Sequence, residues 1–274
     1  MNTRKLVSSL LFFFMIVSLF SITSCTKSED PVSPPDTSVP ATIFPLVANR
    51  QIEYNGWLTQ NDTETKIAPS EAGFYSKWFI HGTVPVNAIF PNPPFTNLSG
   101  FASLIRDTTK IPGVGVASKF TPFLIRYDSA NASYDFLTNI GFFYRTFKVY
   151  TTGTTNIKVD SLRWIKLADT KSGLNKEFTA FDETFTGVVG TASVQVRLQV
   201  LGNFEAKETI TVGTTSYETY RLVAKRKVFI GTTLAAEGLT AKLWLVNNVG
   251  PIQILLIGDA ESHGKFQKMT AKNF

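Results

Sequence analysis

Strict alternation of apolar and polar residues is the feature that most constrains the fold of this 274-residue chain. In residues 194–200, VQVRLQV, valine or leucine fills every second position, with Gln and Arg between them. Successive side chains of a strand point to opposite faces, so this period predicts strands with one buried face. Similar strand-like runs lie at residues 74–80, 141–150, 158–166 and 219–229.

Clusters of Gly, Asn, Ser and Thr separate these runs and predict tight turns at 151–156, 202–203, 212–216 and 247–250. The prolines of residues 91–94 predict a loop, because proline supplies no donor to a strand ladder.

Helical periodicity is absent from any long stretch, and residues 233–237 suit either one helical turn or a hairpin loop. We therefore predict an all-β fold, an antiparallel meander that forms a curved sheet, a barrel or a sandwich with little helix. Membrane β-barrels use a similar alternation. Arg, Lys and Gln on the alternate faces favour a water-soluble domain instead.

The N-terminus has the three parts of a secretory signal peptide. Residues 2–5, NTRK, are basic, residues 6–22 are apolar with four serines, and Thr23 and Ser24 are small. A membrane-spanning helix needs about 20 predominantly apolar residues, so cleavage is the better interpretation.

The only cysteine of the chain, Cys25, follows at once in the sequence Ile22-Thr23-Ser24-Cys25. This motif resembles the lipobox of bacterial lipoproteins. The resemblance implies cleavage before Cys25, lipid attachment to its sulfur and acylation of the new amino group. Several acyl chains on one residue would tether the chain durably to a membrane.

Residues 26–30, TKSED, resemble the export signal of surface lipoproteins of Bacteroidota and lack an Asp directly after the cysteine. This resemblance implies the outer membrane, on its periplasmic or cell-surface face. Residues 31–40 are rich in Pro, Ser and Thr and predict an extended spacer. The predicted organisation is a signal peptide (1–24), a lipid-anchored linker (25–40) and one all-β domain (41–274).

Residues 43–54 resemble the opening of uncharacterised Bacteroidota-type lipoproteins, and residues 209–220 and 243–251 resemble their later strands and Val-Gly ending. The resemblance implies a curved antiparallel sheet similar to that of periplasmic lipoprotein and lipid carriers. Those carriers usually lay helices across the sheet, and this sequence has little helix.

Candidate catalytic groups are few, and we predict no catalytic site, metal site or cofactor. The histidines His81 and His263 lie far apart, and metal sites need three or four ligands. Residues 113–115, GVG, lack the context of a phosphate-binding loop. Asp182 and Glu183 are adjacent acids that would point to opposite faces of a strand, and we expect them in a solvated turn.

The formal charge of +6 comes from 27 basic and 21 acidic residues. Removal of Arg4 and Lys5 with the signal peptide leaves 25 basic residues and a net charge of +4. Residues 225–227, KRK, are the one basic cluster and predict a solvated strand face, so nucleic acid is not an expected partner.

Aromatic residues are concentrated in two runs, which contain Phe74, Tyr75, Trp78 and Phe79, and then residues 142–144. They predict either a hydrophobic core or a surface on which a sugar or an apolar ligand stacks. Adjacent aromatic residues in a strand place one ring on each face, so some aromatic surface is expected.

Three triplets that begin at Asp107, Asp128 and Asp160 resemble the O-glycosylation pattern of Bacteroidota. The resemblance implies acceptor hydroxyls at Thr108, Ser129 and Ser161.

These features predict a lipid-anchored, non-enzymatic envelope protein that binds an apolar or glycan ligand or supports envelope assembly. The alternative is an adhesion or protein-interaction module that docks an envelope protein through a sheet edge.

Overall fold

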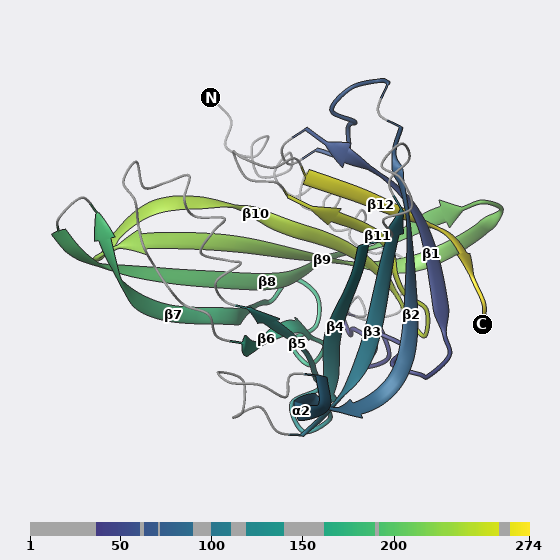
Figure 1. The fold of residues 1–274 in the computed structure, drawn as a ribbon, viewed down its shortest axis with the longest axis horizontal. Coiled ribbons are helices and arrows are strands. Elements are labelled where there is room, and N and C mark those ends of the chain that lie inside the picture. The colour runs from purple at the N-terminus through teal and green to yellow at the C-terminus, as the bar shows by residue number, and fades with distance from the viewer. Residues whose placement is uncertain are drawn as a thin grey trace, which may run out of the picture. The chain divides into compact units, whose positions relative to one another are not determined.

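The computed structural model describes residues 37–60, 63–70, 72–89, 100–110, 119–139, 162–189, 192–257 and 264–274. They form one twelve-stranded antiparallel sheet (Figure 1), which confirms the predicted all-β fold. The first six strands are β1 (Gln51–Thr59), β2 (Phe74–Pro85), β3 (Phe101–Lys110), β4 (Lys119–Asp128), β5 (Ser133–Asn139) and β6 (Leu162–Asp169). The last six are β7 (Glu177–Val189), β8 (Ala192–Val212), β9 (Thr215–Ile230), β10 (Thr233–Val246), β11 (Gly250–Leu256) and β12 (Gly264–Lys272).

The sheet consists of two meanders that join through the first and last strands. Its order is β6-β5-β4-β3-β2-β1-β12-β11-β10-β9-β8-β7. Each strand therefore pairs with its chain neighbours within β1–β6 and within β7–β12, and β1 pairs with β12. The two ends of this order, β6 and β7, contact each other. No ladder joins them within the described residues, so the sheet is nearly closed and barrel-like.

Most of the local predictions that lie on described residues are confirmed. The alternating run 194–200 lies in β8, and turns join β8 to β9 and β10 to β11. The predicted turn at 202–203 is wrong, because both residues lie inside β8 and pair with β7. Residues 233–237 begin β10 and form neither a helical turn nor a loop. Among the described residues the one α-helix is α2 (Val86–Ile89).

The N-terminal end of the described chain is built into the core on the concave side of the sheet. Ile43 is fully buried, and Phe44 packs against Tyr134 with ring centroids 5.2 Å apart. Val39, which the sequence places in the spacer, belongs to the same hydrophobic cluster. The Asn248 amide donates to the Thr42 carbonyl over 2.8 Å. The segment therefore fills space inside the sheet.

A second hydrophobic cluster lies where the end of the β8–β9 hairpin meets β10. Trp244 and Val246 of β10 pack with the end of the β8–β9 hairpin. Leu243 and Leu245 of the same strand belong to the core that contains Ile43. The Trp244 indole Nε1 donates to Glu208 over 2.9 Å, which ties the hairpin to β10.

Two predictions about charged residues are wrong, one of them in part. Arg226, the centre of the basic cluster, is buried at 8% exposure. Lys225 and Lys227 point to the other face of β9, where they are partly exposed and pair with Glu205 and Glu237, so the predicted solvated face holds for these two lysines. Asp182 and Glu183 lie in β7 rather than in a turn. As expected for neighbours in a strand, they have different partners: Arg197 of β8 for Asp182, and Arg163 of β6 for Glu183.

Candidate functional site

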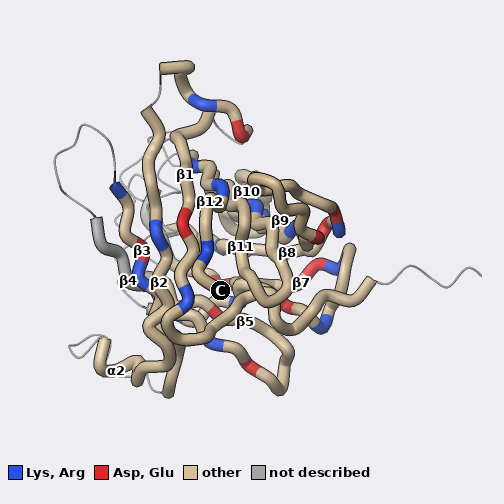
Figure 2. Tube along the Cα trace, turned by 90° about the vertical axis from the view of Figure 1, so that its right-hand side faces the viewer, with Lys and Arg blue, Asp and Glu red and all other residues tan. Residues whose placement is uncertain are grey.

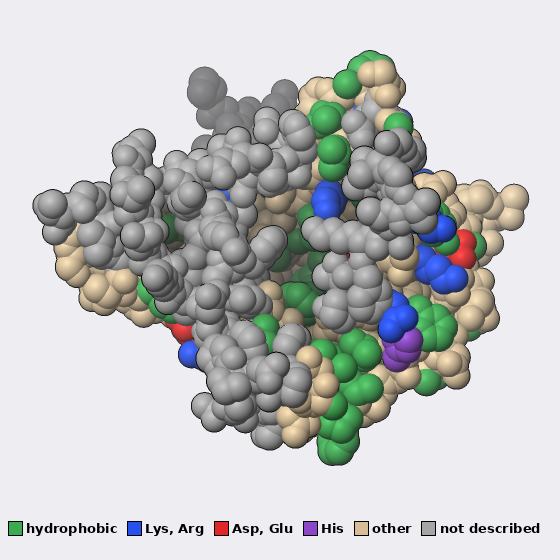
Figure 3. Space-filling model, in the orientation of Figure 1, with side chains coloured by type: hydrophobic (Ala, Val, Ile, Leu, Met, Phe, Trp, Pro, Cys, Tyr) green, Lys and Arg blue, Asp and Glu red, His purple; other side chains and the backbone are tan. Residues whose placement is uncertain are grey.

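A groove on the convex side of β2 and β3 is the candidate site. It encloses about 460 Å³ and is lined by Tyr75, Lys77, Phe79, His81, Arg106, Thr108 and Lys110. Every second residue of β2 contributes, because alternate side chains share one face. Figure 2 shows basic positions on β2 and β3, and Figure 3 shows Lys and Arg side chains beside a histidine on the same side of the molecule.

The strand register sets the order of the side chains in the groove. Tyr75 lies opposite Lys110, Lys77 opposite Thr108, and Phe79 opposite Arg106. Side chains in directly opposed positions have Cβ atoms about 4.5–5.5 Å apart. Each aromatic ring therefore stands beside a cation, and the middle pair combines a cation with a hydroxyl.

A carboxylate of the neighbouring strand, Glu53 of β1, borders the groove. It lies opposite Lys77 and accepts a hydrogen bond from Gln51 Nε2 over 2.6 Å. Desolvation, and then Glu53 through its charge and hydrogen bond, raise the pKa of Tyr75. The Tyr75 phenol therefore stays protonated and acts as a hydrogen-bond donor.

His81 closes the groove at the other end. The register of β2 and β3 shifts between Ile80 and Gly82, so His81 is the extra residue of a β-bulge. Its ring meets Phe79 edge to face, with centroids 4.7 Å apart. Desolvation and then the charge of Arg106 lower the pKa of His81 below the ordinary 6.5. The imidazole is therefore neutral at pH 7.

A half-buried carboxylate lies on the opposite, concave side of the same strands. Asp107 accepts a hydrogen bond from the Ser76 hydroxyl over 2.6 Å, and Ser76 is fully buried. Burial raises the pKa of Asp107, while the Ser76 and Thr109 hydrogen bonds oppose that shift. Asp107 faces away from the groove, so it does not offset the groove's positive charge by direct contact.

The first aromatic run divides between the two faces of β2. Phe74 is buried and Trp78 packs with the core, whereas Tyr75 and Phe79 line the groove. Both predicted uses of these aromatics, core and accessible surface, therefore occur within one strand. Residues 142–144 lie outside the described residues.

The cations of the groove on β3, Arg106 and Lys110, were not singled out from the sequence. Only the pairing of β2 with β3 identifies them as groove residues. That pairing brings residues about thirty positions apart into one groove, and local periodicity does not specify it.

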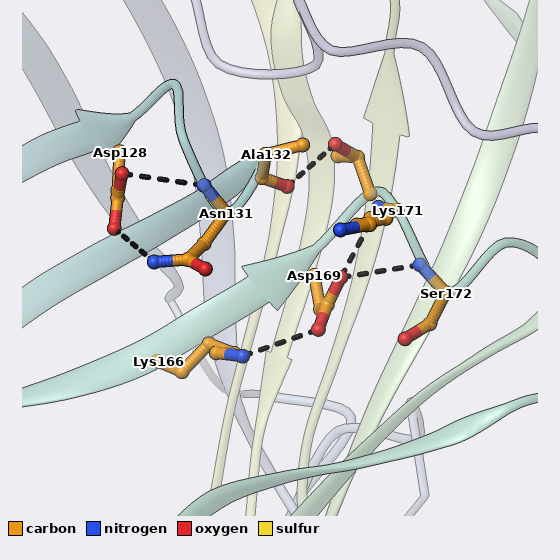
Figure 4. A network of polar contacts seen from close by, with 8 residues as sticks. Asp128, Asn131, Ala132, Lys166, Asp169, Lys171 and Ser172 are labelled. Carbon is orange, nitrogen blue, oxygen red and sulfur yellow. Dashed lines mark hydrogen bonds and ion pairs between the residues drawn. The ribbon is translucent and has the colours of Figure 1, made fainter.

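The three predicted glycosylation acceptors are in different situations. Thr108 lies in the groove, and Ser129 is exposed in the turn between β4 and β5. In that turn Asp128 accepts hydrogen bonds from the Asn131 amide and side chain (Figure 4). The Ala130 amide donates to Asp128 as well. Asp128 thus has a structural role of its own. Ser161 lies outside the described residues.

The remaining predicted groups form no second site. Cys25, residues 113–115 and His263 lie outside the described residues. Among the described residues, no three His, Cys, Asp or Glu side chains come close enough to hold a metal ion. No helix in this part of the chain has the length and apolar character needed to cross a membrane.

Comparison with known proteins gives two structural neighbours. No protein-family model and no curated protein matches the chain. A "putative lipoprotein" from Parabacteroides distasonis matches with 9% identity and a TM-score of 0.42, over 85% of this chain and 98% of that one. An exported protein with a YmcC-like fold from Bacteroides fragilis matches with 10% identity and a TM-score of 0.42, over 84% and 98%. At this level of similarity neither assigns a function to the chain.

Proposed function

We propose that this chain is a lipid-anchored envelope lipoprotein whose β-domain binds a glycan, without catalysis, in the groove between β2 and β3. The observation that carries the proposal is the groove itself: an open concave surface that combines two aromatic rings with several hydrogen-bonding side chains. A sugar ring has an apolar C–H face and a rim of hydroxyls. Tyr75 and Phe79 offer surfaces for that face, and Thr108 and the lysines offer partners for the rim.

Side chains fill the concave side of the sheet, and this favours a ligand site on the outer surface over one inside the sheet. The N-terminal segment and large side chains such as Phe178 and Phe204 fill the hydrophobic core on the concave side. An apolar ligand would need to displace them, whereas a glycan in the groove displaces only water.

The anchor part of the proposal rests on Cys25 and the residues before it. A triacylated Cys25 would hold the chain at the outer membrane, with residues 26–36 between the lipid and the first described residue. Replacement Cys25→Ser should abolish incorporation of labelled fatty acid and release the protein from the membrane fraction. Label that persists in the variant would exclude lipid attachment at this residue.

A panel of neutral and acidic oligosaccharides tests the binding part. Residues 25–274 carrying Cys25→Ser should bind at least one member saturably in calorimetric titration. Phe79→Ala should weaken that binding, whereas Phe101→Ala, which removes a ring that is 67% exposed and outside the groove, should leave it unchanged. If no saccharide binds, the glycan-binding proposal fails.

A further inference from the structure

We propose that the domain rests against a phospholipid bilayer through an apolar rim at the end of the sheet where the chain enters it. The apolar rim consists of Val47, Pro85, Phe101 and Tyr127. This inference rests on the proposed anchor at Cys25 and goes beyond it, because it names the surface of the domain that contacts the membrane.

The members of the rim are exposed although they are apolar. Phe101 is 67% exposed, Val47 54% and Tyr127 38%, and Pro85 is exposed as well. Single exposed apolar side chains are common on soluble proteins, whereas a contiguous group of them marks an interaction surface. Their positions in the sheet decide which of these two cases applies.

The strand order places all four residues at one end of the sheet. Val47 lies in the turn before β1, Pro85 ends β2, Phe101 begins β3, and Tyr127 is the penultimate residue of β4. These neighbouring strands are antiparallel, so the starts of β1 and β3 adjoin the ends of β2 and β4.

Cross-strand register joins three members of the rim into a row. Phe101 lies opposite Pro85, and Ser103 lies opposite Ile125. Two residues further along the second register, Phe101 comes opposite Tyr127, and directly opposed side chains share one face of a sheet. Figure 3 shows hydrophobic side chains at the edge of the molecule where Figure 1 places the end of β2 and the helix α2.

Val47 lies beside this row. Its chain neighbour Ala48 packs against β2, since a Cβ atom added at Gly82 would lie 3.0 Å from the Ala48 Cβ. Pro85 follows Gly82 by three residues in the same strand. The four side chains therefore form one group along the rim.

The position of the first described residue, Thr37, favours a bilayer as the partner of the rim. The Thr37 carbonyl accepts a hydrogen bond from the Leu174 amide over 2.8 Å, in the connection from β6 to β7. In the same connection the Thr170 amide donates over 3.0 Å to the Ala132 carbonyl, in the turn after β4. Tyr127 immediately precedes that turn, so Thr37 and the rim share one end of the domain.

The tether is short enough to keep this end close to the membrane. The chain advances twelve residues from Cys25 to Thr37, and an extended chain of that length spans at most about 40–43 Å. An acylated Cys25 would therefore raise the local concentration of the rim at the bilayer, so that a weak contact is enough to orient the domain. Phe and Tyr are side chains that favour the membrane–water interface.

A second copy of the chain fits the rim less well. Stable interfaces between proteins use about 20–30 residues on each side. The rim offers four, in a narrow row. A bilayer needs no complementary shape and can accept a row of this size.

Lipid quenching of a tryptophan placed in the rim tests the contact. The mature chain, residues 25–274, has a single thiol at Cys25, which can be coupled to a maleimide lipid in phosphatidylcholine vesicles. Phe101→Trp and Val47→Trp would each be coupled to vesicles with brominated acyl chains, because bromine quenches indole fluorescence at short range. We expect the added fluorescence of both probes to fall at least about twofold, since interfacial side chains lie about 5–10 Å deep.

Leu234→Trp is the matched control. Leu234 is 46% exposed and lies at the start of β10, whereas the end of β10 adjoins the N-terminal segment through the bond between Asn248 and Thr42. Its added fluorescence should not change with brominated lipid. The coupled chain without a probe gives the signal of the four native tryptophans, which is subtracted.

A second substitution locates the effect in the rim. In the Val47→Trp chain, the further change Phe101→Glu should reduce quenching to the level of the control, because a carboxylate is costly to transfer out of water. Both positions are exposed, so neither change should affect the fold.

Equal quenching of Phe101→Trp and Leu234→Trp, or quenching of neither, would overturn the bilayer inference. So would a dimer of the Cys25→Ser chain in sedimentation that Phe101→Glu dissociates, which would identify a second copy as the partner. The coupling replaces the acyl anchor, so these results do not depend on acylation in the cell. Failure of the fatty-acid labelling experiment would reject the proposed anchor alone.

Discussion

Arg163 Nε lies 3.7 Å from Glu183 Oε1, and this contact joins β6 to β7, the two ends of the sheet order. Behind it, Ile165 of β6 packs in one cluster with Phe181 of β7 and Val196 of β8. The sheet is therefore brought together at this seam by side chains, because no ladder joins β6 to β7 within the described residues.

The apolar contact should contribute more to the stability of the seam than the ion pair. Ile165 is 7% exposed, so Ile165→Ala should lower the free energy of unfolding by about 2–5 kcal/mol. The side chains of Arg163 and Glu183 are 52% and 39% exposed, so Arg163→Ala should cost less than about 1 kcal/mol. Urea denaturation of both variants measures the difference, and a larger loss in Arg163→Ala would contradict it.

Gly202 should tolerate no side chain, although it lies within a strand. A Cβ atom at this position would lie 2.2 Å from Cζ of the Phe178 ring, which is itself buried. We expect Gly202→Ala to destabilise the domain by about 1–3 kcal/mol through overpacking. Gly238→Ala in β10 is the control, since a Cβ there meets nothing within 4 Å. Equal unfolding midpoints for the two variants would contradict the packing explanation.

The same glycine shows where prediction from sequence failed. A Gly-Asn pair is a turn signal because both residues tolerate unusual backbone angles. At residues 202–203 the glycine is instead required by a ring on the neighbouring strand, a contact that only the β7–β8 register creates. The alternation of 194–200, by contrast, depends on one strand and its own two faces, and it was sufficient to predict β8.

For a similar reason, the sequence predicts the side chains that β2 contributes to the candidate site but not those that β3 contributes. Period two separates Tyr75 and Phe79 from Phe74 and Trp78 within β2 without any knowledge of the neighbours. Arg106 enters the groove only through the pairing of β2 with β3, and that register depends on the whole sheet.

The buried N-terminal segment should stabilise the domain. Ile43 is fully buried, so Ile43→Ala should lower the free energy of unfolding by about 2–5 kcal/mol. Val47 in the same segment is 54% exposed, and Val47→Ala should change it by less than about 0.5 kcal/mol. A similar small effect of both changes in chemical denaturation would show that the segment is not part of the stabilising core.

Asp107 should make stability depend on pH in an unusual direction for a carboxylate. Burial raises its pKa above the ordinary 3.8, so the folded state favours the protonated form. Its stabilising contribution is therefore present below the unfolded-state pKa and is lost as the pH rises through the folded-state pKa. Asp107→Asn keeps an acceptor for the Ser76 hydroxyl and carries no charge, so it should gain stability relative to the unmodified chain at pH 7 but not at pH 3.

Asp128 provides a control of opposite sign. Its hydrogen bond from the Asn131 side chain, with the backbone bonds of the turn, lowers its pKa. That contribution is present above the unfolded-state pKa and is lost as the pH falls through the folded-state pKa. Asp128→Asn should therefore lose stability at pH 7, with a smaller loss at pH 3. Urea denaturation at both pH values measures the two variants, and the same sign for both would contradict this assignment.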